Sequence, residues 1–581
     1  MKFGTALQVP RVHGSRALLS AVVLAAVVAA LTAALWRRDD VPPQTRAVVL
    51  RRGNGAEPES LDPHRARSEA ALTILRDLYE GLTEIGPDGA PVLAAADRCA
   101  ISSDGITYRF HLRAQAHWSN GEPVVAEDFA AAWRRLVDPH TGAQYAQLLG
   151  PVQGAEAITA GLAPASTLGV QAVDPATLMV TLTRPTAYFL DLLAHPATFP
   201  INRTALAQHP SGFAKPGVMV SNGAFVLARW DFGSHLVAVR NHRYWNDAAT
   251  QLDGVEYYSM TEPATELRAF RSGALDLTST IPGAQFAWVK EHLGTELHIA
   301  PQLGVYYLGL NLRRAPFAHS PQLRRALSLV IDRERLVQSV TGTGESAAYT
   351  FVPPQTRNYS PPLPEYAGWP MPRRIARARE LLAEAGMLQS PPALELRYNS
   401  GELHGRIAVA IAGMWKQALG VDTVLHAEEF KVLLQDIDRG DVTQVFRASW
   451  LADYDDASSF LQVLQSGFGI NLPRYANAEY DDLLARAAHE VDAGRRRALL
   501  ENAEQVMIGD QPLIPLYFYV AKHLVSARVR GWRDNAMNVV YSKQLLKNVV
   551  YSEQVLKDSS TPAISSRAMT GDSPAKTRDS R

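Results

Sequence analysis

Residues 449–460 read SWLADYDDASSF, and this short stretch holds three acids among large aromatic side chains: Asp453, Asp455 and Asp456. A carboxylate is costly to bury without a partner, so such a cluster calls for a counter-charge, a metal ion or water. The stretch therefore indicates a catalytic site, a cation site or a pocket that holds a positively charged ligand. The rest of the chain has to decide among these three.

A metal site does not fit the residues of this stretch or the rest of the chain. Asp453 and Asp455 match two ligand positions of a calcium loop, but Ala457 and Ser458 replace the third ligand and the turn glycine. The sixteen histidines show no ligand spacing. The single cysteine, Cys99, excludes a cysteine cluster and an intrachain disulfide, and we expect it to be a small buried side chain. We therefore expect neither a metal nor a cofactor.

The common catalytic motifs are also missing from the sequence. No HExxH occurs, and the glycine-rich segment 341–346, TGTGES, lacks the spacing and the lysine of a phosphate-binding loop. No G-x-S-x-G nucleophile elbow is present. Spacing alone leaves a pair of catalytic carboxylates open at 449–460. We expect no catalytic residues, and a hydrolase that uses the acidic cluster stays as an alternative.

Length and charge define the broad class of protein. With 581 residues, the chain is too long for a single hydrophobic core, so we expect more than one domain. Lys plus Arg and Asp plus Glu both number 58, which leaves no net charge. A nucleic-acid-binding protein would carry a basic excess or a basic stripe, so no nucleic-acid partner is expected.

The N-terminus carries a targeting segment. Residues 17–36 form a run of twenty apolar or small residues with arginines on both sides. Such a run is long enough to span a bilayer, and its basic flank and small residues also fit an export signal. No cysteine directly follows the run, which excludes lipoprotein processing. Residues 1–50 are thus an export signal or a membrane anchor, plus a linker, and in both cases the remaining chain crosses a membrane.

Hydrophobic periodicity predicts a mixture of strands and helices, with several sheets. Ser320 and Pro321 are suited to start a helix, and Gly386 and Gly420 are suited to end two others. The predicted helices are 126–138, 320–332, 373–386, 404–420, 478–489 and 493–508. The predicted strands are 108–112 and 513–520, with a hairpin at 223–230 and 235–241.

A tandem duplication lies near the C-terminus. NVVYSKQLLK (538–547) is followed directly by NVVYSEQVLK (548–557). Two copies are too few for a solenoid, so we expect the second copy to be an appended strand-like or loose segment. The tail 559–581 is rich in Ser, Thr, Lys and Arg, and is expected to be disordered.

Seven stretches together resemble one protein family, the periplasmic oligopeptide-binding proteins of ABC importers, which are family 5 of the solute-binding proteins. The resemblance is colinear from about Arg51 to about Lys547. Its stretches are GNGAEPESLDPH (53–64), RDLYEGL (76–82), HWSNGEPVVAEDFAAAWRRLVDP (117–139), SNGAFVLARW…RNHRYWN (221–246), NLRRAPF (311–317), LLAEAG (381–386) and SWLADYDDASSF (449–460).

The resemblance implies an α/β fold of the periplasmic-binding-protein type: a two-lobed clamp of class II type with an extra inserted domain. Lobe I would be discontinuous and consist of 51–83, 199–278 and 518–558. The smaller inserted domain would cover 84–198, and lobe II would cover 279–517.

The resemblance also implies the function. Family members bind short peptides in extended form through β-augmentation, a mode that tolerates many peptide sequences because every peptide has the same backbone. They deliver these peptides to an inner-membrane ABC permease. We therefore expect a monomeric, non-enzymatic protein of the periplasm, free or tethered by residues 17–36. A murein-peptide receptor and a membrane-anchored peptide sensor on the same scaffold are alternatives.

The family pattern assigns roles to charged residues. The resemblance implies that the family's aspartate for the peptide ammonium aligns with Asp453. A carboxylate suits this role because it offers charge-assisted acceptors to an ammonium. The basic residues that receive the peptide carboxylate correspond to Arg447, His404 and Arg314. Arg314 stands where the family usually has lysine, and its planar fork binds a carboxylate in a bidentate manner that lysine cannot match.

Three aromatic residues are expected as pocket walls. Trp450 and Tyr145 retain the family's aromatic residues, and Phe430 replaces a tryptophan. One further family arginine has no clean counterpart, because Ile437 falls near its place and Arg439 lies two positions away.

The two remaining acids of the opening stretch receive no ligand role. Asp455 and Asp456 replace other polar residues of the family pattern. We expect both to be solvated loop acids, so that the family resemblance leaves Asp453 alone as the ligand-binding carboxylate of this stretch.

Overall fold

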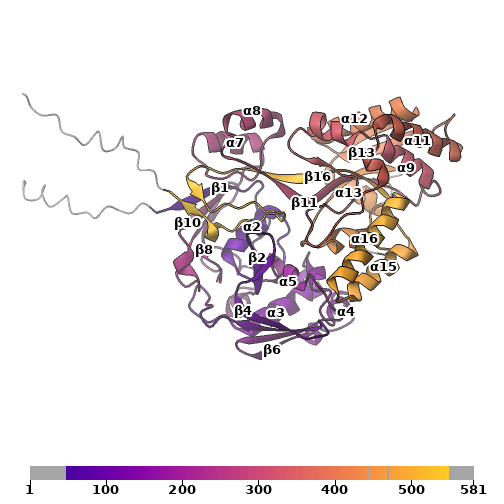
Figure 1. Ribbon diagram of the computed structural model, residues 1–581. Helices are drawn as coiled ribbons and strands as arrows, with labels where there is room; N and C mark the ends of the chain where they lie inside the picture. Colours follow the sequence, from indigo (N-terminus) through magenta and orange to yellow (C-terminus); the bar gives the residue numbers. More distant parts are fainter. Residues whose placement is uncertain (1–46, 441–443, 468–469, 549–581) are drawn as a thin grey trace, which may run out of the picture. The chain divides into compact units, whose positions relative to one another are not determined.

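A computed structural model describes residues 47–440, 444–467 and 470–548 (Figure 1). By internal contacts the chain divides into two units, Met1–Ala47 and Val48–Arg581, and the fold below is that of the second unit. The predicted signal or anchor at 17–36, all but the first residue of the second repeat copy and the tail 559–581 lie outside the described residues. Within the described part, no helix is both long and apolar enough to cross a membrane.

One four-stranded sheet combines the start of the described chain with a segment two hundred residues later. Its strand order is β1-β10-β9-β8, and β1 pairs in parallel with β10. The strands are β1 (Val49–Gly53), β8 (Phe225–Asp231), β9 (His235–Arg240) and β10 (Gly254–Tyr258). The predicted hairpin of β8 and β9 is confirmed.

A second four-stranded sheet lies in the segment 84–198, which the family resemblance assigns to an inserted domain. Its order is β4-β5-β7-β6, and helix α3 (Ala126–Val137) contacts β6 and β7. Its strands are β4 (Ala96–Ile101), β5 (Thr107–Leu112), β6 (Val170–Asp174) and β7 (Thr177–Thr181). The predicted strand at 108–112 and the helix at 126–138 are confirmed.

The largest sheet has six strands in the order β12-β16-β11-β15-β13-β14. Two long antiparallel strands, β11 and β16, pair over most of their length. The strands are β11 (Leu297–Leu310), β12 (Ser346–Ala347), β13 (Leu394–Asn399), β14 (Thr423–Glu428), β15 (Val445–Leu451) and β16 (Leu513–Leu524). The strand predicted at 513–520 is therefore confirmed, but it is four residues longer.

Capping residues set the helix ends where the sequence places them. The Ser320 hydroxyl accepts a hydrogen bond from the Leu323 N–H at the start of α9, and Gly420 ends α12 in the left-handed region. The predicted helices correspond to α9 (Pro321–Leu329), α11 (Met371–Glu384), α12 (Glu402–Leu419), α15 (Ala478–His489) and α16 (Ala493–Asp510). Helix α13 (Phe430–Arg439) was not predicted.

The remaining elements are short. The further helices are α2 (Glu69–Leu78), α4 (Ala155–Thr159), α5 (Phe189–Leu192), α6 (Arg203–Gln208), α7 (Pro263–Arg271), α8 (Phe286–His292), α10 (Arg333–Arg335) and α14 (Ser458–Leu461). The further strands are β2 (Thr83–Ile85), β3 (Pro91–Leu93), β17 (Val529–Arg530) and β18 (Leu546–Lys547).

Alternating side chains of β15 enter two different hydrophobic cores. Phe446 and Ala448 belong to the core that includes residues of α15 and α16, whereas Val445 belongs to the core beneath α9, α11 and α12. Successive residues of a strand point to opposite faces, so the six-stranded sheet is covered on both sides. Figure 1 shows these two groups of helices near the sheet.

The first copy of the C-terminal repeat is part of the folded core. Leu545 is fully buried, and the Lys543 ammonium lies 2.9 Å from the carboxylate of Glu80 and also pairs with Glu84.

Cys99 is a free cysteine, and it is only partly buried against the same core as Leu545. The expectation of a buried side chain was therefore wrong.

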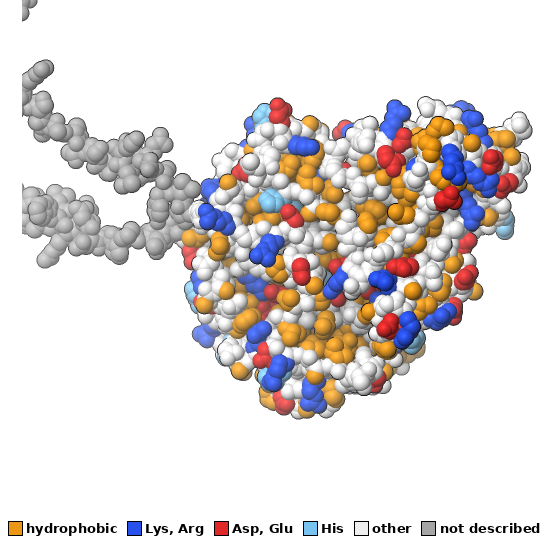
Figure 2. Space-filling view, viewed as in Figure 1, with side chains coloured by type: hydrophobic (Ala, Val, Ile, Leu, Met, Phe, Trp, Pro, Cys, Tyr) orange, Lys and Arg blue, Asp and Glu red, His pale blue; other side chains and the backbone are white. Residues whose placement is uncertain are grey.

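Charges of both signs are mixed on the surface. On the face drawn in Figure 2, lysine and arginine side chains alternate with acidic ones among the described residues. This distribution agrees with the balanced composition, and on this face it does not form the continuous basic stripe of a nucleic-acid-binding surface.

Candidate functional site

Asp453 follows the end of β15 and has a half-buried carboxylate. Its backbone N–H donates a hydrogen bond to the Ser459 hydroxyl, at 3.1 Å. Among the described residues, no cation forms an ion pair with its side chain. Burial raises the pKa of this carboxyl to about 6, because the charged form loses solvation and gains no partner. Asp453 is therefore poised to receive a cation.

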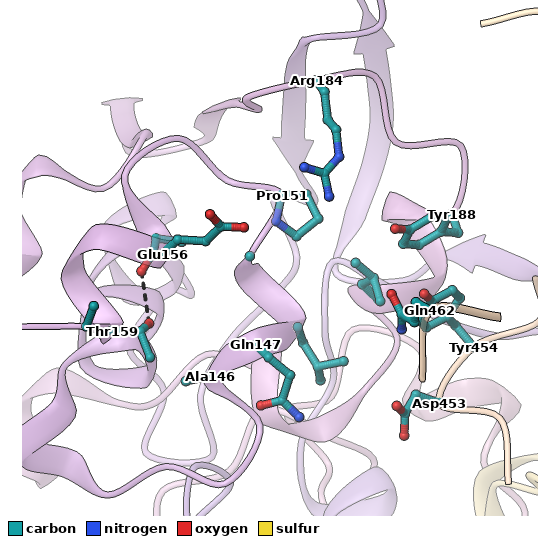
Figure 3. A pocket seen from close by; sticks show the side chains of 15 residues that line it. Ala146, Gln147, Pro151, Glu156, Thr159, Arg184, Tyr188, Asp453, Tyr454 and Gln462 are labelled. Carbon is teal, nitrogen blue, oxygen red and sulfur yellow. Dashed lines mark hydrogen bonds between the residues drawn. The ribbon is translucent and has the colours of Figure 1, made fainter. Parts of the chain in front are cut away.

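A cavity of about 450 Å³ opens beside this carboxylate (Figure 3). Asp453, Tyr454 and Gln462 form one wall, and residues between 146 and 192 form the other. Figure 3 shows the side chains of Arg184, Gln147 and Asp453 around the open space. The volume is within the usual range for small-ligand sites, so it exceeds the needs of one ammonium group.

Tyr145 lies next to this cavity without lining it, so its assignment as a pocket wall stays a prediction. It directly precedes the turn Ala146–Leu149, whose residues line the cavity. Its hydroxyl donates to the Arg67 carbonyl oxygen at 3.4 Å, and its ring centroid is 4.4 Å from that of His195. Burial and then the nearby charge of Asp453 raise the pKa of Tyr145 to about 12. The structure thus brings Tyr145 close to Asp453.

Arg447 lies in the middle of β15 and is held by neutral partners. Its Nη1 donates to Asn399 Oδ1 at 3.1 Å, its Nη2 donates to the Tyr519 hydroxyl at 3.2 Å, and its guanidinium lies 4.6 Å from the centre of the Tyr306 ring. Its Nε is buried and finds no hydrogen-bond partner in the described structure. Burial opposes the charge, but the tyrosines, Tyr519 foremost, outweigh it and raise the pKa.

His404, in the first turn of α12, shares Tyr306 with Arg447. Its Nδ1 is 3.2 Å from the Tyr306 hydroxyl. Burial, together with the positive charge of Arg447, lowers the pKa of His404 to about 4. The imidazole is thus neutral at pH 7 and offers a hydrogen bond rather than a charge. The structure brings these two predicted carboxylate-binding residues together.

The residues that hold this pair were missed by the sequence analysis. They are Asn399 on β13, Tyr306 on β11, and Tyr517 and Tyr519 on β16. Tyr306 is the register partner of Tyr517, and their rings stack at 4.8 Å. The signal was present as tyrosines at alternate positions, 517 and 519, which place two rings on one face of the predicted strand.

Arg314 is not part of this group. It lines a separate cavity of about 190 Å³. That cavity also includes Ile437 at the end of α13 and three further arginines: Arg313, Arg439 and Arg474. Ile437, which falls near the place of the missing family arginine, and Arg439 therefore line the same cavity as Arg314. Its assignment to the peptide carboxylate stays a prediction.

The other two predicted wall residues, Trp450 and Phe430, do not line the cavity beside Asp453. Trp450 lies on the face of β15 opposite to Arg447 and packs against the core that contains Phe446, and its Nε1 is buried without a partner among the described residues. Phe430 begins α13 and has 49% of its surface exposed. Both wall assignments stay predictions.

The expectation for the two other acids of the opening stretch was wrong. Asp456 is 14% exposed and accepts two hydrogen bonds from Arg496, at 2.7 and 2.8 Å. Asp455 is 9% exposed and accepts from the Arg357 N–H at 2.9 Å. Both are paired because the loop packs against the start of α16 and the segment around Arg357, contacts that the local sequence does not reveal.

No metal centre is found within the part of the chain that the structure describes, where no three His, Cys, Asp or Glu side chains form a ligand group. The site instead offers a carboxylate without a cation, Asp453, and a guanidinium without an anion, Arg447. Six residues of extended chain span at most about 20 Å, so the two Cα atoms lie within that distance. Arg447 does not line the cavity beside Asp453, but two opposite charges at this spacing along the chain are complementary to a dipolar ligand.

Comparisons with known proteins agree with this fold. A family model described as "Bacterial extracellular solute-binding proteins, family 5 Middle" matches residues 90–471. The chain is 36% identical over 524 residues to the periplasmic oligopeptide-binding protein OppA of Escherichia coli K12, which covers 89% of this chain and 95% of that protein. It is 38% identical over 526 residues to the probable deoxycholate-binding periplasmic protein YgiS of the same organism, over 89% and 98% of the two chains.

Two solved structures are similar over most of the chain. The murein tripeptide-binding protein MppA of Escherichia coli has a TM-score of 0.76 and 34% identity, with 87% of this chain and 99% of that chain covered. Haemophilus influenzae OppA in complex with RPPGFSPFR has a TM-score of 0.75 and 33% identity, with 86% and 99% covered. The fold is thus the two-lobed α/β fold of solute-binding proteins. The chain belongs to the bacterial extracellular solute-binding proteins of family 5.

Proposed function

We propose that this protein binds short peptides in extended form and passes them to an inner-membrane ABC permease. The observation that carries the proposal is the pair of unpaired charges, Asp453 for the peptide ammonium and Arg447 for the peptide carboxylate. A tripeptide in extended form spans roughly 10 Å. That length is shorter than the upper limit of about 20 Å between the two Cα atoms.

The peptide charge at each end is recognised by groups of different kinds. The Asp453 carboxylate accepts hydrogen bonds from the ammonium, and the guanidinium of Arg447 donates to the carboxylate. Neutral His404 adds a donor near Arg447 without repelling it. Because side chains of the protein bind both ends of the peptide, the side chains of the peptide can occupy the cavity next to Asp453.

Closure of two lobes around the peptide follows from the family fold. We propose the boundaries given by the sequence: lobe I from 51–83, 199–278 and 518–558, an inserted domain at 84–198, and lobe II at 279–517. A ligand that contacts both lobes only when they are closed shifts the population toward that state by its differential affinity. Asp453 and the residues 146–192 across the cavity support this proposal, since they come from different proposed domains.

We further propose that the protein acts in the periplasm as a monomer and performs no catalysis. The relatives named above are periplasmic by name. Residues 17–36 would either be removed as an export signal or retained as a tether to the inner membrane. A tethered form would act as a sensor or as a receptor next to its permease.

Two other ligand classes occur among the relatives, murein tripeptide and deoxycholate. Asp453 argues against an anionic ligand such as deoxycholate, because a half-buried carboxylate without a partner repels a negative charge. A murein peptide carries an ammonium and a carboxylate like any other short peptide, so it stays a candidate within the same proposal.

Mass spectrometry of the ligands that co-purify with the protein tests the proposal. Release of short peptides is the expected result, and release of a bile acid would contradict it. Calorimetry with a synthetic tripeptide should then give one site per chain. Analysis of the same sample by chromatography should recover the tripeptide intact, whereas cleavage products would favour the hydrolase alternative.

A further inference from the structure

Arg357 connects two segments that are distant in sequence. One guanidinium nitrogen donates to the carboxylate of Asp191, which is on α5 in the segment 84–198. Its backbone N–H donates to the carboxylate of Asp455 at 2.9 Å, and its Nε lies 3.6 Å from the other oxygen of that carboxylate. Asp191 has 5% of its side chain exposed and Arg357 has 31%, so the contact is shielded from water on the Asp191 side.

A second set of contacts joins the same two segments. The rings of Tyr188 and Tyr454 stack with centroids 4.4 Å apart and an angle of 9° between their planes. The Arg496 guanidinium lies 5.6 Å from the centre of the Tyr188 ring while it binds Asp456 through two hydrogen bonds. Stacked rings and a cation over a ring each add to the attraction between the surfaces.

These contacts all meet at the loop that carries the predicted ammonium-binding group. Residues 454, 455 and 456 follow Asp453 directly, and each has a partner in one of the two sets. Tyr188 lines both the cavity beside Asp453 and the cavity around Arg357. The Arg357 contacts therefore hold the chain two residues after Asp453.

We propose that Arg357 is a latch: by binding Asp191 and Asp455 together, it holds the segment 84–198 against the loop 453–456 and slows the release of the bound ligand. The proposal rests on the proposed function in one respect, that the ligand is a peptide bound at Asp453. Arg357 does not line the cavity beside Asp453, so we treat it as a positioning residue. Breaking a shielded charge pair acts mainly on the dissociation rate.

The test compares tripeptide dissociation rates, measured by stopped-flow fluorescence, for wild type, Asp191→Asn and Arg357→Gln. Each variant is expected to release the tripeptide about tenfold faster, with an association rate within about twofold of wild type. Arg357→Lys keeps the charge but cannot form the same set of contacts, so its rate should lie between those of wild type and Arg357→Gln.

A matched control is Asp247→Asn, which breaks the contact between Asp247 and Arg240 within the segment 199–278. This variant should release the tripeptide at the wild-type rate. A dissociation rate of Asp191→Asn within twofold of wild type would overturn the latch. So would equal rates for Arg357→Lys and Arg357→Gln, since the charge would then be irrelevant.

Amide hydrogen exchange separates a failure of the latch from a failure of the proposed function. In Arg357→Gln, residues 187–193 and 353–358 should exchange faster than in wild type, with or without tripeptide, while Asp247→Asn should leave both unchanged. Unchanged exchange in Arg357→Gln would refute the latch. If wild type bound no tripeptide, the peptide function would be wrong, and the exchange result would still decide on the latch.

Discussion

Asp453 and Arg447 lie six residues apart on one strand and the loop after it, and in the described structure neither has a partner of opposite charge. Burying a charge without compensation costs stability. The protein nevertheless pairs the two neighbouring acids, Asp455 and Asp456, with arginines. Among the charged residues between 447 and 456, Asp453 and Arg447 are therefore the two without an opposite charge, which is the pattern of a binding site rather than of a structural ion pair.

Removing the guanidinium of Arg447 should weaken peptide binding. We expect Arg447→Leu to lower the affinity for a free tripeptide by roughly 100-fold, because the peptide carboxylate loses its charged partner. A C-terminally amidated tripeptide should bind wild type about as weakly as the free tripeptide binds the variant. Calorimetry measures both values.

The control for this experiment is Arg439→Leu, since Arg439 faces the separate cavity of Arg314. Its affinity for a tripeptide should match that of wild type. If Arg439→Leu weakened binding as strongly as Arg447→Leu, the carboxylate would lie in the other cavity and the assignment to Arg447 would be wrong.

Peptide affinity should depend on pH through Asp453. Its pKa is about 6 in the free protein, and binding of an ammonium requires the ionised form. The association constant should be constant near pH 7 and then fall by about tenfold per unit once the pH is below 6. His404, with a pKa of about 4, does not titrate in this window. Titration calorimetry from pH 5 to 7.5 tests this, and Asp453→Asn should give a flat profile.

Replacement of the carboxylate by an amide should change the free energy of unfolding in opposite directions at Asp453 and Asp456. At pH 7.5, Asp453→Asn should raise the free energy of unfolding by about 1–3 kcal/mol, because the carboxyl pKa is raised in the folded state and its charged form is disfavoured there. Asp456→Asn should lower it by roughly 2–4 kcal/mol, because the variant loses the bidentate contact with Arg496. Urea unfolding without peptide measures both.

The sign of each stability change follows from the direction in which the fold shifts the pKa of that carboxyl. For Asp456, Arg496 outweighs burial and lowers the pKa, so its stabilising contribution is complete at neutral pH and is lost as the pH falls through that lowered value. For Asp453, the destabilising contribution is complete above pH 6 and disappears as the pH falls below 6. A loss of stability in Asp453→Asn at pH 7.5 would show that this carboxylate has a partner in the fold.

Lys543, in the first copy of the repeat, should be essential for stability. Lys543→Met leaves Glu80 and Glu84 buried without a cation, and this should lower the free energy of unfolding by roughly 3–5 kcal/mol. Lys416→Met, which breaks an exposed pair with Asp422, should cost less than about 1 kcal/mol. If denaturant titrations gave the same loss of stability for Lys543→Met and Lys416→Met, the contacts of Lys543 would contribute no more to stability than an exposed ion pair.

The sequence predicted the elements well where local signals act. Ser320 caps α9, and Gly420 ends α12, because both effects depend on residues within one turn. Asp453, Arg447 and His404 were identified from a resemblance to the family, and the fold places Arg447 and His404 on either side of one tyrosine, Tyr306.

Contacts between distant segments could not be predicted in this way. Asp455 is held by Arg357, nearly a hundred residues earlier, and the local pattern of the loop gives no sign of that partner. Arg314 lies in another cavity, four residues after the end of β11. Its charge and its place in the family motif are visible in the sequence, but the direction of its side chain is not.

The most direct test of the account is a calorimetric cycle with a free and an N-acetylated tripeptide on wild type and Asp453→Asn. The account predicts tight binding only for the free tripeptide on wild type, with about the same weak affinity in the other three cases, because acetylation and the substitution remove the two partners of one contact. Binding of the free tripeptide to Asp453→Asn with wild-type affinity would contradict the assignment of Asp453 as the group that holds the peptide ammonium.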